Sequence, residues 1–360
     1  MALFDLPLSA LKEYKPETYE AADFDQFWIG HLREARRTDS ILACDPVETD
    51  LVTVDTWDLT FAGDARHPIR AWYTRPAGSG GAKLPAVVEF AGYGRGRGRT
   101  LERLAWASAG YAHLIMDTRG QGSQHGTGGD TADPVGSEPS HPGFLTRGIL
   151  DRDDYYYRRL IIDAVRAVDA VRTLADVDVN AVSAVGGSQG GGLALAVAGL
   201  VPDLRAVIAN VPFLSHIPRA LDITDSDPYG ELVRYLSVQR GNEDQVFHTL
   251  SYIDAMHLAR RAQAPALFSV GLRDVVCPPS TVFAAFNHYG ALTAGEFGNE
   301  DGEPEPGVTD EPEPGVTDEQ RKSVDAPEKE IAIYPWNNHE GGDAVQLEKG
   351  LHWLRRQLIS

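Results

Sequence analysis

A serine flanked by glycines, with an acid and a histidine later in the chain, is the strongest chemical signal in this sequence. Residues 185–192 read Val-Gly-Gly-Ser-Gln-Gly-Gly-Gly, so that Ser188 occupies a Gly-x-Ser-x-Gly motif. Between a strand and a helix, this motif forms a sharp turn that exposes a serine hydroxyl above a parallel sheet. A helix that starts there directs free N–H groups toward a developing oxyanion. The motif therefore predicts acyl transfer, and a plain glycine-rich turn is the weaker interpretation.

A serine nucleophile needs a base and an acid that orients the base, and in this type of fold the acid precedes the histidine. Asp274 follows the predicted strand 266–270, and His339 follows the predicted strand 331–334. Ligand sites gather at the carboxyl ends of parallel strands, which favours both residues. The rivals either fall within helical patterns or lie in an irregular region where they would be solvated or capping: His288, His352, Asp222, Asp225 and Asp227.

Backbone N–H groups at two turns are expected to stabilise the oxyanion. One belongs to Gln189, directly after the serine, and the other to Tyr93, in the loop after the predicted strand 85–90. Such a donor typically stabilises the transition state by about 3–4 kcal/mol. Three residues near strand ends or in the irregular region are further expected to wall a small acyl pocket: Phe213, Pro228 and Val276.

Two other chemistries fit the sequence less well. Neither glycine-rich run, 92–98 or 186–192, matches G-x-G-x-x-G with an acid about 20 residues later, so dinucleotide binding is disfavoured. The sequence has no His-Glu-x-x-His motif, and His339 lacks a partner at ligand spacing, which argues against a metal centre. Asp117, at a predicted strand end, is interpreted as a structural ion-pair partner of Arg119. We expect no cofactor.

The elements that would position these residues alternate between strands and helices. Two β-rich runs, at 51–61 and 69–73, precede short apolar strands separated by helical patterns such as 158–174. The strands predicted in this alternating part are 85–90, 112–116, 181–185, 206–211, 266–270 and 331–334. Alternation with continuous Val, Ile, Leu and Ala strands predicts an α/β fold, a mostly parallel sheet flanked by helices.

The chain is expected to form a single domain over 1–360. Within it, aromatic residues at helical spacing predict a helical lead-in over 1–45, and an irregular stretch over 212–262 interrupts the alternation as a cap-like insertion. The aromatic residues of the lead-in are Phe24, Phe27 and Trp28.

The charge of the chain is concentrated in one segment. The 360 residues carry 52 acidic and 33 basic side chains, a formal net charge of −19, which disfavours nucleic acid and anionic membrane surfaces as partners. Residues 296–330 alone hold 13 acidic and 3 basic side chains, a net of −10. The octapeptide EPEPGVTD at 303–310 recurs at 311–318, and its Pro, Gly and acid content predicts an inserted acidic loop over 292–328.

The remaining composition places the protein in a reducing compartment. Two cysteines, Cys44 and Cys277, cannot build a disulfide framework, and such a count is typical of the cytoplasm. The N-terminal residues lack a basic start followed by a long apolar run, so no secretory signal is expected. No stretch approaches ~18 uninterrupted apolar residues, so no membrane span is expected either. We predict a soluble, cytoplasmic protein.

Strings along nearly the whole chain resemble the cephalosporin C deacetylase/acetyl xylan esterase family, carbohydrate esterase family 7 of the α/β-hydrolases. They include Asp117-Thr-Arg-Gly-Gln-Gly-Ser, Pro142-Gly-Phe-Leu-Thr-Arg-Gly-Ile-Leu-Asp, Tyr155-Tyr-Tyr-Arg-Arg, Asn210-Val-Pro-Phe-Leu, Pro278-Pro-Ser-Thr-Val-Phe and Asn337-Asn-His-Glu-Gly-Gly. Several of these strings serve no general hydrolase purpose, which makes the resemblance specific.

The resemblance implies a serine esterase that hydrolyses acetyl esters of small alcohols, among them acetylated xylo-oligosaccharides and cephalosporin C. It implies Ser188, Asp274 and His339 as the catalytic triad, with oxyanion donors at Tyr93 and Gln189. It also implies a homo-oligomer, a hexamer built as a trimer of dimers, and no metal or organic cofactor.

Two features depart from the family pattern. The loop 94–99, Gly-Arg-Gly-Arg-Gly-Arg, is more basic than the usual glycine-rich stretch, which bears on the preference for the alcohol part of the ester. The acidic insert at 292–328 bears on the assembly. The alternatives are a serine peptidase of the prolyl oligopeptidase type, disfavoured because only about 180 residues precede Ser188, and an α/β-hydrolase-like binding protein without catalysis.

Overall fold

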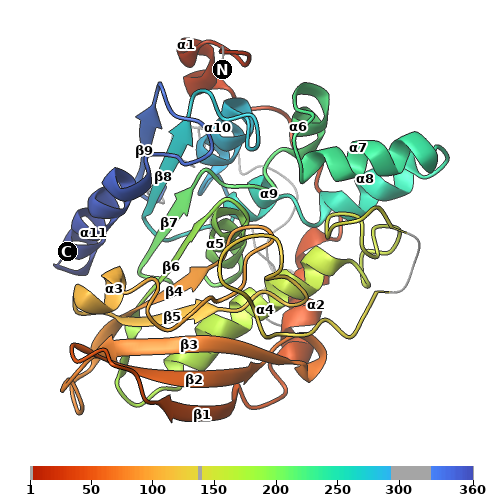
Figure 1. The fold of residues 1–360 in the computed structure, drawn as a ribbon. Coiled ribbons are helices and arrows are strands. Elements are labelled where there is room, and N and C mark those ends of the chain that lie inside the picture. The colour runs from red at the N-terminus through yellow and green to blue at the C-terminus, as the bar shows by residue number, and fades with distance from the viewer. Residues whose placement is uncertain (1–2, 137–139, 293–325, 360) are drawn as a thin grey trace, which may run out of the picture.

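A nine-stranded mixed sheet is the centre of the molecule (Figure 1). The structure, a computed structural model, describes residues 3–136, 140–292 and 326–359. The strands are β1 (Ile41–Val47), β2 (Val54–Ala62), β3 (Pro68–Pro76), β4 (Leu84–Phe90), β5 (Ala112–Met116), β6 (Val177–Gly187), β7 (Ala206–Asn210), β8 (Ala266–Gly271) and β9 (Lys329–Tyr334). Their order is β1-β2-β3-β5-β4-β6-β7-β8-β9.

The sheet divides into an antiparallel and a parallel part. The first three strands pair antiparallel with one another, and β3 pairs antiparallel with β5. From β5 through β4, β6, β7 and β8 to β9 every neighbouring pair is parallel, so the carboxyl ends of these strands meet at one edge. The predicted α/β-hydrolase fold is confirmed.

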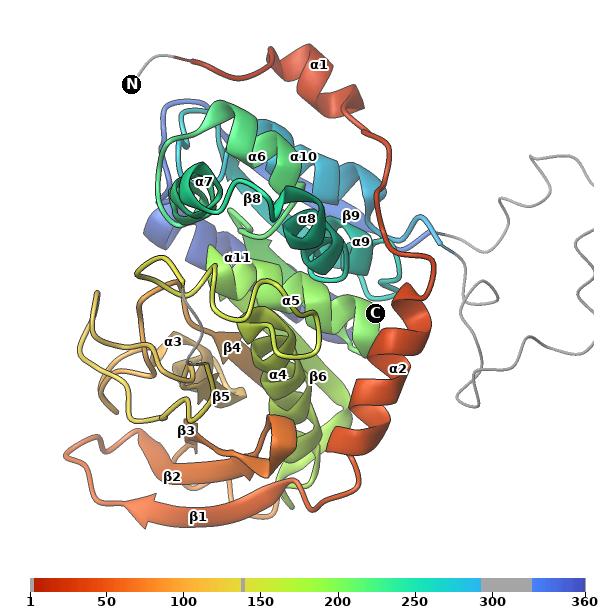
Figure 2. The same cartoon turned by 90° about the vertical axis from the view of Figure 1, so that its right-hand side faces the viewer.

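Helices cover both faces of the sheet (Figure 2). They are α1 (Leu8–Glu13), α2 (Phe24–Ala35), α3 (Ala105–Ser108), α4 (Tyr156–Arg172), α5 (Gln189–Leu200), α6 (Ile217–Ile223), α7 (Tyr229–Val238), α8 (Glu243–Ser251), α9 (Ala255–Ala259), α10 (Pro279–His288) and α11 (Asp343–Ile359), with a short 3-10 helix at Asp64–Arg66. Among the described helices, none is both long and apolar enough to cross a bilayer.

Two hydrophobic clusters lie on opposite faces because successive strand residues point to opposite sides of a sheet. The larger cluster, under α4, α5 and α10, receives one set of strand residues: Val88, Ala184, Val207 and Phe268. The residues directly before or after them point to the second cluster, which α3 and α11 cover: Val87, Val185, Ile208 and Leu267. Burial on both faces explains why the parallel strands are continuous apolar runs rather than alternating ones.

The predicted strands of the alternating part coincide with β4 to β9 within a few residues, and the strand around 181–185 is longer than expected, Val177–Gly187. The helical lead-in expected over 1–45 ends earlier, because α2 stops at Ala35 and the strand β1 begins at Ile41. The side chains of β1 are largely exposed at the sheet edge, so this strand lacks the apolar pattern that marks a buried one.

The irregular region and the acidic segment lie at different places. Residues 212–262 contain α6 to α9, and α7 reaches the cavity that holds Ser188. Most of the loop predicted over 292–328 lies outside the described residues. The described chain on either side of it comes together, since a Cβ on Gly290 would lie 2.4 Å from a ring carbon of Pro327.

Candidate active site

Ser188 lies at the sharp turn between β6 and α5. Its backbone angles, φ 58° and ψ −120°, are strained for a residue with a side chain, and they expose the hydroxyl above the sheet. The turn requires glycine on both sides. A Cβ on Gly186 would lie 2.2 Å from the backbone of Gly190, and one on Gly190 would lie 2.0 Å from the carbonyl oxygen of Phe90. The Gly-x-Ser-x-Gly spacing therefore follows from close backbone contact.

The structure brings the three predicted triad residues into one hydrogen-bonded chain. The Nε2 atom of His339 lies 2.9 Å from the Oγ of Ser188, and its Nδ1 lies 2.8 Å from the Oδ2 of Asp274. Asp274 is fully buried, whereas the His339 side chain is partly exposed to the cavity. This geometry allows the imidazole to take a proton from the serine while the carboxylate orients the ring.

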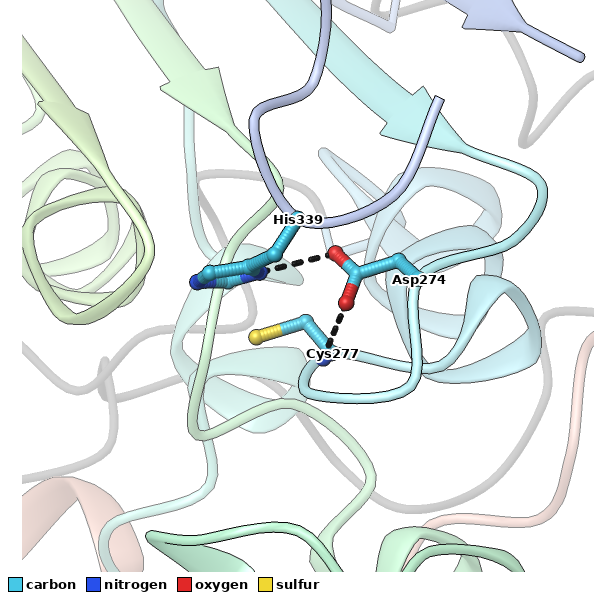
Figure 3. A group of neighbouring side chains, drawn as sticks. All are labelled: Asp274, Cys277 and His339. Carbon is cyan, nitrogen blue, oxygen red and sulfur yellow. Dashed lines mark hydrogen bonds and ion pairs between the residues drawn. The ribbon is translucent and has the colours of Figure 1, made fainter. Parts of the chain in front are cut away.

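The carboxylate of Asp274 is fixed by its own turn. Its other oxygen, Oδ1, accepts hydrogen bonds from the backbone N–H groups of Val276 and Cys277, at 2.8 and 2.9 Å. Figure 3 shows the two carboxylate oxygens used in this way, one toward His339 and one toward the turn. The backbone N–H of Asp274 donates to the carbonyl of Gly271, the last residue of β8.

Cys277 is a further chemical group at the site, and sequence reasoning assigned it no role there. Among the described residues, the ligand atoms of Asp274, Cys277 and His339 lie within 4.8 Å of one another, a spacing that could hold a metal ion. Burial, reinforced by the charge of Asp274, raises the pKa of the Cys277 thiol well above its usual range. A thiol that stays protonated is a poor nucleophile. The Nδ1 of His339 and the Oδ2 of Asp274 are already bonded to each other, so the cluster suits an acid–histidine pair.

The two residues expected to stabilise the oxyanion flank Ser188. Gln189 is the first residue of α5, and the first N–H groups of a helix have no partner within it. The backbone N–H of Tyr93 donates to no acceptor in the described part of the chain. The side chain of Gln189 is buried and donates to the carbonyl of Ala91 at 3.3 Å, which joins the serine turn to the loop after β4.

Glu231 on α7 holds Tyr93 in place, and sequence reasoning missed it. The Tyr93 hydroxyl donates to the carboxylate of Glu231 and accepts from the backbone N–H of Phe144 at 2.7 Å. The same carboxylate accepts from the N–H groups of Phe144 and Leu145, at 3.1 and 3.0 Å. Burial raises the pKa of Glu231, and burial with the adjacent carboxylate raises that of Tyr93. No local motif signals a partner 138 residues away.

A cavity of about 770 Å³ opens above Ser188 and His339. Pro228 and Val276, two of the residues expected at the acyl pocket, line it. The third, Phe213, is fully buried behind the wall, where its ring packs 4.5 Å from that of Tyr229 and its N–H donates to the carbonyl of Ser188.

The interpretation of Asp117 as an ion-pair partner of Arg119 is wrong. Arg119 pairs with Asp163, with Nη2 and Oδ1 2.6 Å apart. The carboxylate of Asp117 instead accepts three backbone N–H groups, from Arg97, Thr118 and Asp130, at 2.8, 3.1 and 2.6 Å. It thus ties the loop after β4 to the loop after β5, an arrangement that adjacency in sequence could not reveal.

The sequence matches one protein family and a curated relative whose names agree in activity. The family model described as acetyl xylan esterase (AXE1) matches residues 1–296, a range that includes Ser188 and Asp274. A curated relative, the acetyl esterase Axe7A of Xylanibacter ruminicola, is 33% identical over 282 residues. That alignment covers 76% of this chain but only 61% of the length of the relative.

Two solved structures resemble the whole chain. The acetyl xylan esterase from Paenibacillus sp. R4 is 33% identical with a TM-score of 0.82, and acetyl xylan esterase 1 from Thermoanaerobacterium sp. is 30% identical with a TM-score of 0.80. Each alignment covers 98% of this chain and 99% of the other. A puromycin-hydrolysing peptidase of Mycobacterium tuberculosis, 18% identical with a TM-score of 0.54, shares the fold alone.

Proposed function

The chain belongs to the acetyl xylan esterase family, and on this premise we propose that it is a carboxylic ester hydrolase that removes acetyl groups from small O-acetylated alcohols. In this proposal Ser188 is the nucleophile, His339 the general base and acid, and Asp274 the group that orients the imidazole. The observation that carries the proposal is the continuous hydrogen-bonded chain Ser188–His339–Asp274 at the carboxyl ends of β6, β9 and β8.

Acylation begins when the Oγ of Ser188 attacks the acetyl carbonyl carbon while its proton moves to the Nε2 of His339. The tetrahedral intermediate carries a negative oxygen, which the N–H groups of Tyr93 and Gln189 stabilise by about 3 kcal/mol each. The bond between the carbonyl carbon and the alcohol oxygen then breaks, and His339 returns the proton to the leaving alcohol. The acetyl group remains bonded to Ser188.

Deacylation repeats these steps with water. His339 takes a proton from a water molecule, whose oxygen attacks the acetyl-serine carbonyl, and the same two N–H groups stabilise the second oxyanion. The intermediate collapses, the proton on His339 passes to the Oγ of Ser188, and acetic acid leaves and loses its remaining proton to solvent as acetate. The serine hydroxyl, the neutral imidazole and the aspartate are thereby restored. No metal or organic cofactor takes part in the proposed cycle.

A small acyl pocket would make acetate the preferred acyl group. Pro228 and Val276 line the cavity beside Ser188, and Phe213 supports the wall from behind. The test is the hydrolysis of p-nitrophenyl esters of increasing acyl length by the purified protein. We expect kcat/KM to be highest for acetate, whereas a preference for butyrate or octanoate would reject the pocket.

The alcohol part of the natural substrate is the finer question. Acetylated xylo-oligosaccharides and cephalosporin C are the two candidates that the resemblance in sequence implies, and the cavity of about 770 Å³ has room for groups larger than methanol or ethanol. Steady-state kinetics on both compounds with the same preparation would rank them. A peptide amide assayed in parallel separates the esterase from the peptidase alternative, since we expect no turnover of the amide.

We also propose that the protein acts as a cytoplasmic homo-oligomer, a hexamer as the resemblance implies. The exposed thiol of Cys44 and the buried thiol of Cys277 are both free, which suits a reducing compartment. Size-exclusion chromatography with light scattering measures the mass of the assembly, and a monomeric mass would contradict the proposed oligomer. Fractionation of the cells that express the protein tests its proposed cytoplasmic location.

A further inference from the structure

The wall of the active-site cavity carries several charged side chains, and half of them pair with an opposite charge. Glu89 pairs with Arg103 and with His113. Burial acts to raise the pKa of Glu89, but these two partners outweigh it and hold that pKa at about 2. Asp227 pairs with Arg234. These groups therefore offer little net charge to a bound substrate.

Glu231 is also engaged, through Tyr93 and two backbone N–H groups. Apart from Glu231, which has no ion pair either, two charged side chains of the wall have no ion pair in the part of the chain that the structure describes. They are Arg95, in the loop after β4, and Glu340, in the loop after β9. Glu340 is bound by the side-chain amide of Asn337 and by the N–H of Asn338, at 2.8 and 3.1 Å.

Arg95 differs from the two other arginines of its basic loop. Arg97 is buried beneath the ring of Trp72, 3.6 Å from its centre, and pairs with Asp58 and Asp130. Arg99 is exposed and does not line the cavity. Arg95 alone of the three lines the cavity that holds Ser188, and its side chain is exposed there.

The backbone around Arg95 is held firmly. The N–H of Gly94 donates to the side-chain oxygen of Gln121 at 2.6 Å, and its carbonyl accepts from the N–H groups of Gln124 and His125, both at 3.2 Å. Asp117 binds the N–H of Arg97 on the other side. These bonds hold the backbone of the loop beside the segment 124–126 and thereby restrict where the Arg95 guanidinium can lie.

Two further side chains on that segment, Gln124 and His125, line the cavity and can also donate hydrogen bonds. We propose that Arg95, with these two residues, forms an anion-binding subsite for the alcohol part of the substrate. The preferred esters would then be acetylated alcohols that carry a carboxylate, such as uronic-acid-bearing oligosaccharides. This inference rests on the proposed esterase function, because it concerns the charge on the alcohol part of the ester that the enzyme would cleave.

The chemistry of the guanidinium favours this ligand. Arginine is always charged and presents its N–H donors in a planar fork that matches a carboxylate. Because Arg95 is exposed to solvent, the attraction is weakened by water and salt. We expect an effect of about three- to fivefold in kcat/KM, expressed mainly in KM, since the contact is made equally in the bound substrate and in the transition state.

The experiment compares three acetyl esters of matched shape: anionic 4-acetoxybenzoate, neutral 4-acetoxybenzamide and cationic 4-acetoxy-N,N,N-trimethylanilinium. The ratio of kcat/KM for the anionic and neutral esters is measured for the wild type, Arg95→Gln, Arg95→Lys and the control Arg99→Gln. Comparing variants cancels the intrinsic reactivity of each ester. We expect Arg95→Gln to lower the ratio about three- to fivefold, Arg95→Lys to retain most of it, and Arg99→Gln to leave it unchanged.

Each other outcome has a defined meaning. An equal fall in Arg95→Gln and Arg99→Gln would replace the subsite by a general field of the loop and overturn the inference. An unchanged ratio in Arg95→Gln, or a kcat/KM for the cationic ester that falls in this variant as much as that for the anionic ester, would overturn it as well and direct attention to Glu340. If the wild type hydrolyses none of the three esters, the proposed function itself fails. Loss of the preference at 0.5 M salt would support the inference further.

Discussion

The two sides of the candidate active site are built in different ways. On one side, Asp274 is fixed by N–H groups only two and three residues further along its own turn, and it holds His339 from the next strand of the sheet. On the other side, Tyr93 is held through its side chain by Glu231, which belongs to α7 in the region 212–262. The Asp274 carboxylate is therefore held by its own turn and by the loop of the neighbouring strand. The side chain of Tyr93, in contrast, is held by a residue 138 positions away in the sequence.

This difference has a functional consequence. The bonds to the Asp274 carboxylate and the His339 ring all come from residues 274–277, His339 and Ser188. The region 212–262 touches this turn only from the side, where Thr224 donates to the carbonyl of Val275, so a change at Glu231 should leave these bonds intact. The oxyanion side depends on α7, so the same change should move the N–H of Tyr93 relative to the serine. The two sides can therefore be tested separately with substitutions that remove one support at a time.

The largest effect is expected from removing the group that both sides serve. Ser188→Ala should lower kcat for p-nitrophenyl acetate by about 10⁴-fold or more, because no other group can form the acyl intermediate. The fold should be retained, since alanine fills the same turn; far-ultraviolet circular dichroism and thermal unfolding check this. Turnover retained at more than a few per cent would remove Ser188 from the mechanism.

The next effect breaks the acid–histidine side alone. Asp274→Asn should lower kcat by about 10³- to 10⁴-fold, because the amide favours the wrong imidazole tautomer and cannot stabilise its charged form. The matched control is Asp222→Asn, an exposed acid in the region 212–262, whose kinetics should equal those of the wild type. An Asp274→Asn enzyme within tenfold of the control would contradict the assignment of the orienting acid.

A smaller loss is expected when the oxyanion side is weakened. Glu231→Gln removes the charge that accepts the Tyr93 hydroxyl and two N–H groups, and we expect kcat to fall by about 10- to 100-fold with KM nearly unchanged. The control Glu243→Gln alters an exposed carboxylate at the start of α8 and should have no effect. A change confined to KM would show that Glu231 shapes the cavity and does not position Tyr93.

The pH dependence of stability gives a second reading of Glu231. Burial raises the pKa of this carboxyl above its ordinary value of about 4.3, so the folded state binds its proton more tightly than the unfolded state does. Stability from this group is therefore lost as the pH rises from about 4.3 through the raised pKa. Urea unfolding between about pH 4 and 7 should show a smaller loss in Glu231→Gln than in the wild type. If the free energy of unfolding fell equally with pH in both proteins, the raised pKa of Glu231 would be contradicted.

The smallest effect is expected from the acidic segment. A chain that lacks residues 296–326 should hydrolyse p-nitrophenyl acetate within about twofold of the wild-type rate, because the described chain on either side of the segment is already in contact at Gly290 and Pro327. Light scattering on the same protein reports whether assembly changes. A folded but inactive deletion variant would show that the segment positions His339.

The contrast between the two sides also explains what could be predicted. Ser188, Asp274 and His339 each lie directly after a strand whose apolar run is visible in the sequence, so fold and spacing predict them together. Glu231 and the N–H groups bound by Asp117 have no such local signal. Their partners are far away in the sequence, 138 residues for Tyr93 and Glu231, and only the folded chain brings them together. The sequence did not predict the strand β1, because its exposed side chains carry no apolar pattern.

The site at which a fluorophosphonate reacts tests most directly whether Ser188 is the nucleophile. We expect one phosphonyl adduct per chain, located by peptide mass spectrometry on Ser188, with slower labelling in Asp274→Asn and none at this position in Ser188→Ala. The Cys277 thiol, close to the same serine and held protonated, should remain unmodified. Absence of labelling in the active wild-type enzyme, or an adduct on a residue other than Ser188, would show that Ser188 is not the nucleophile.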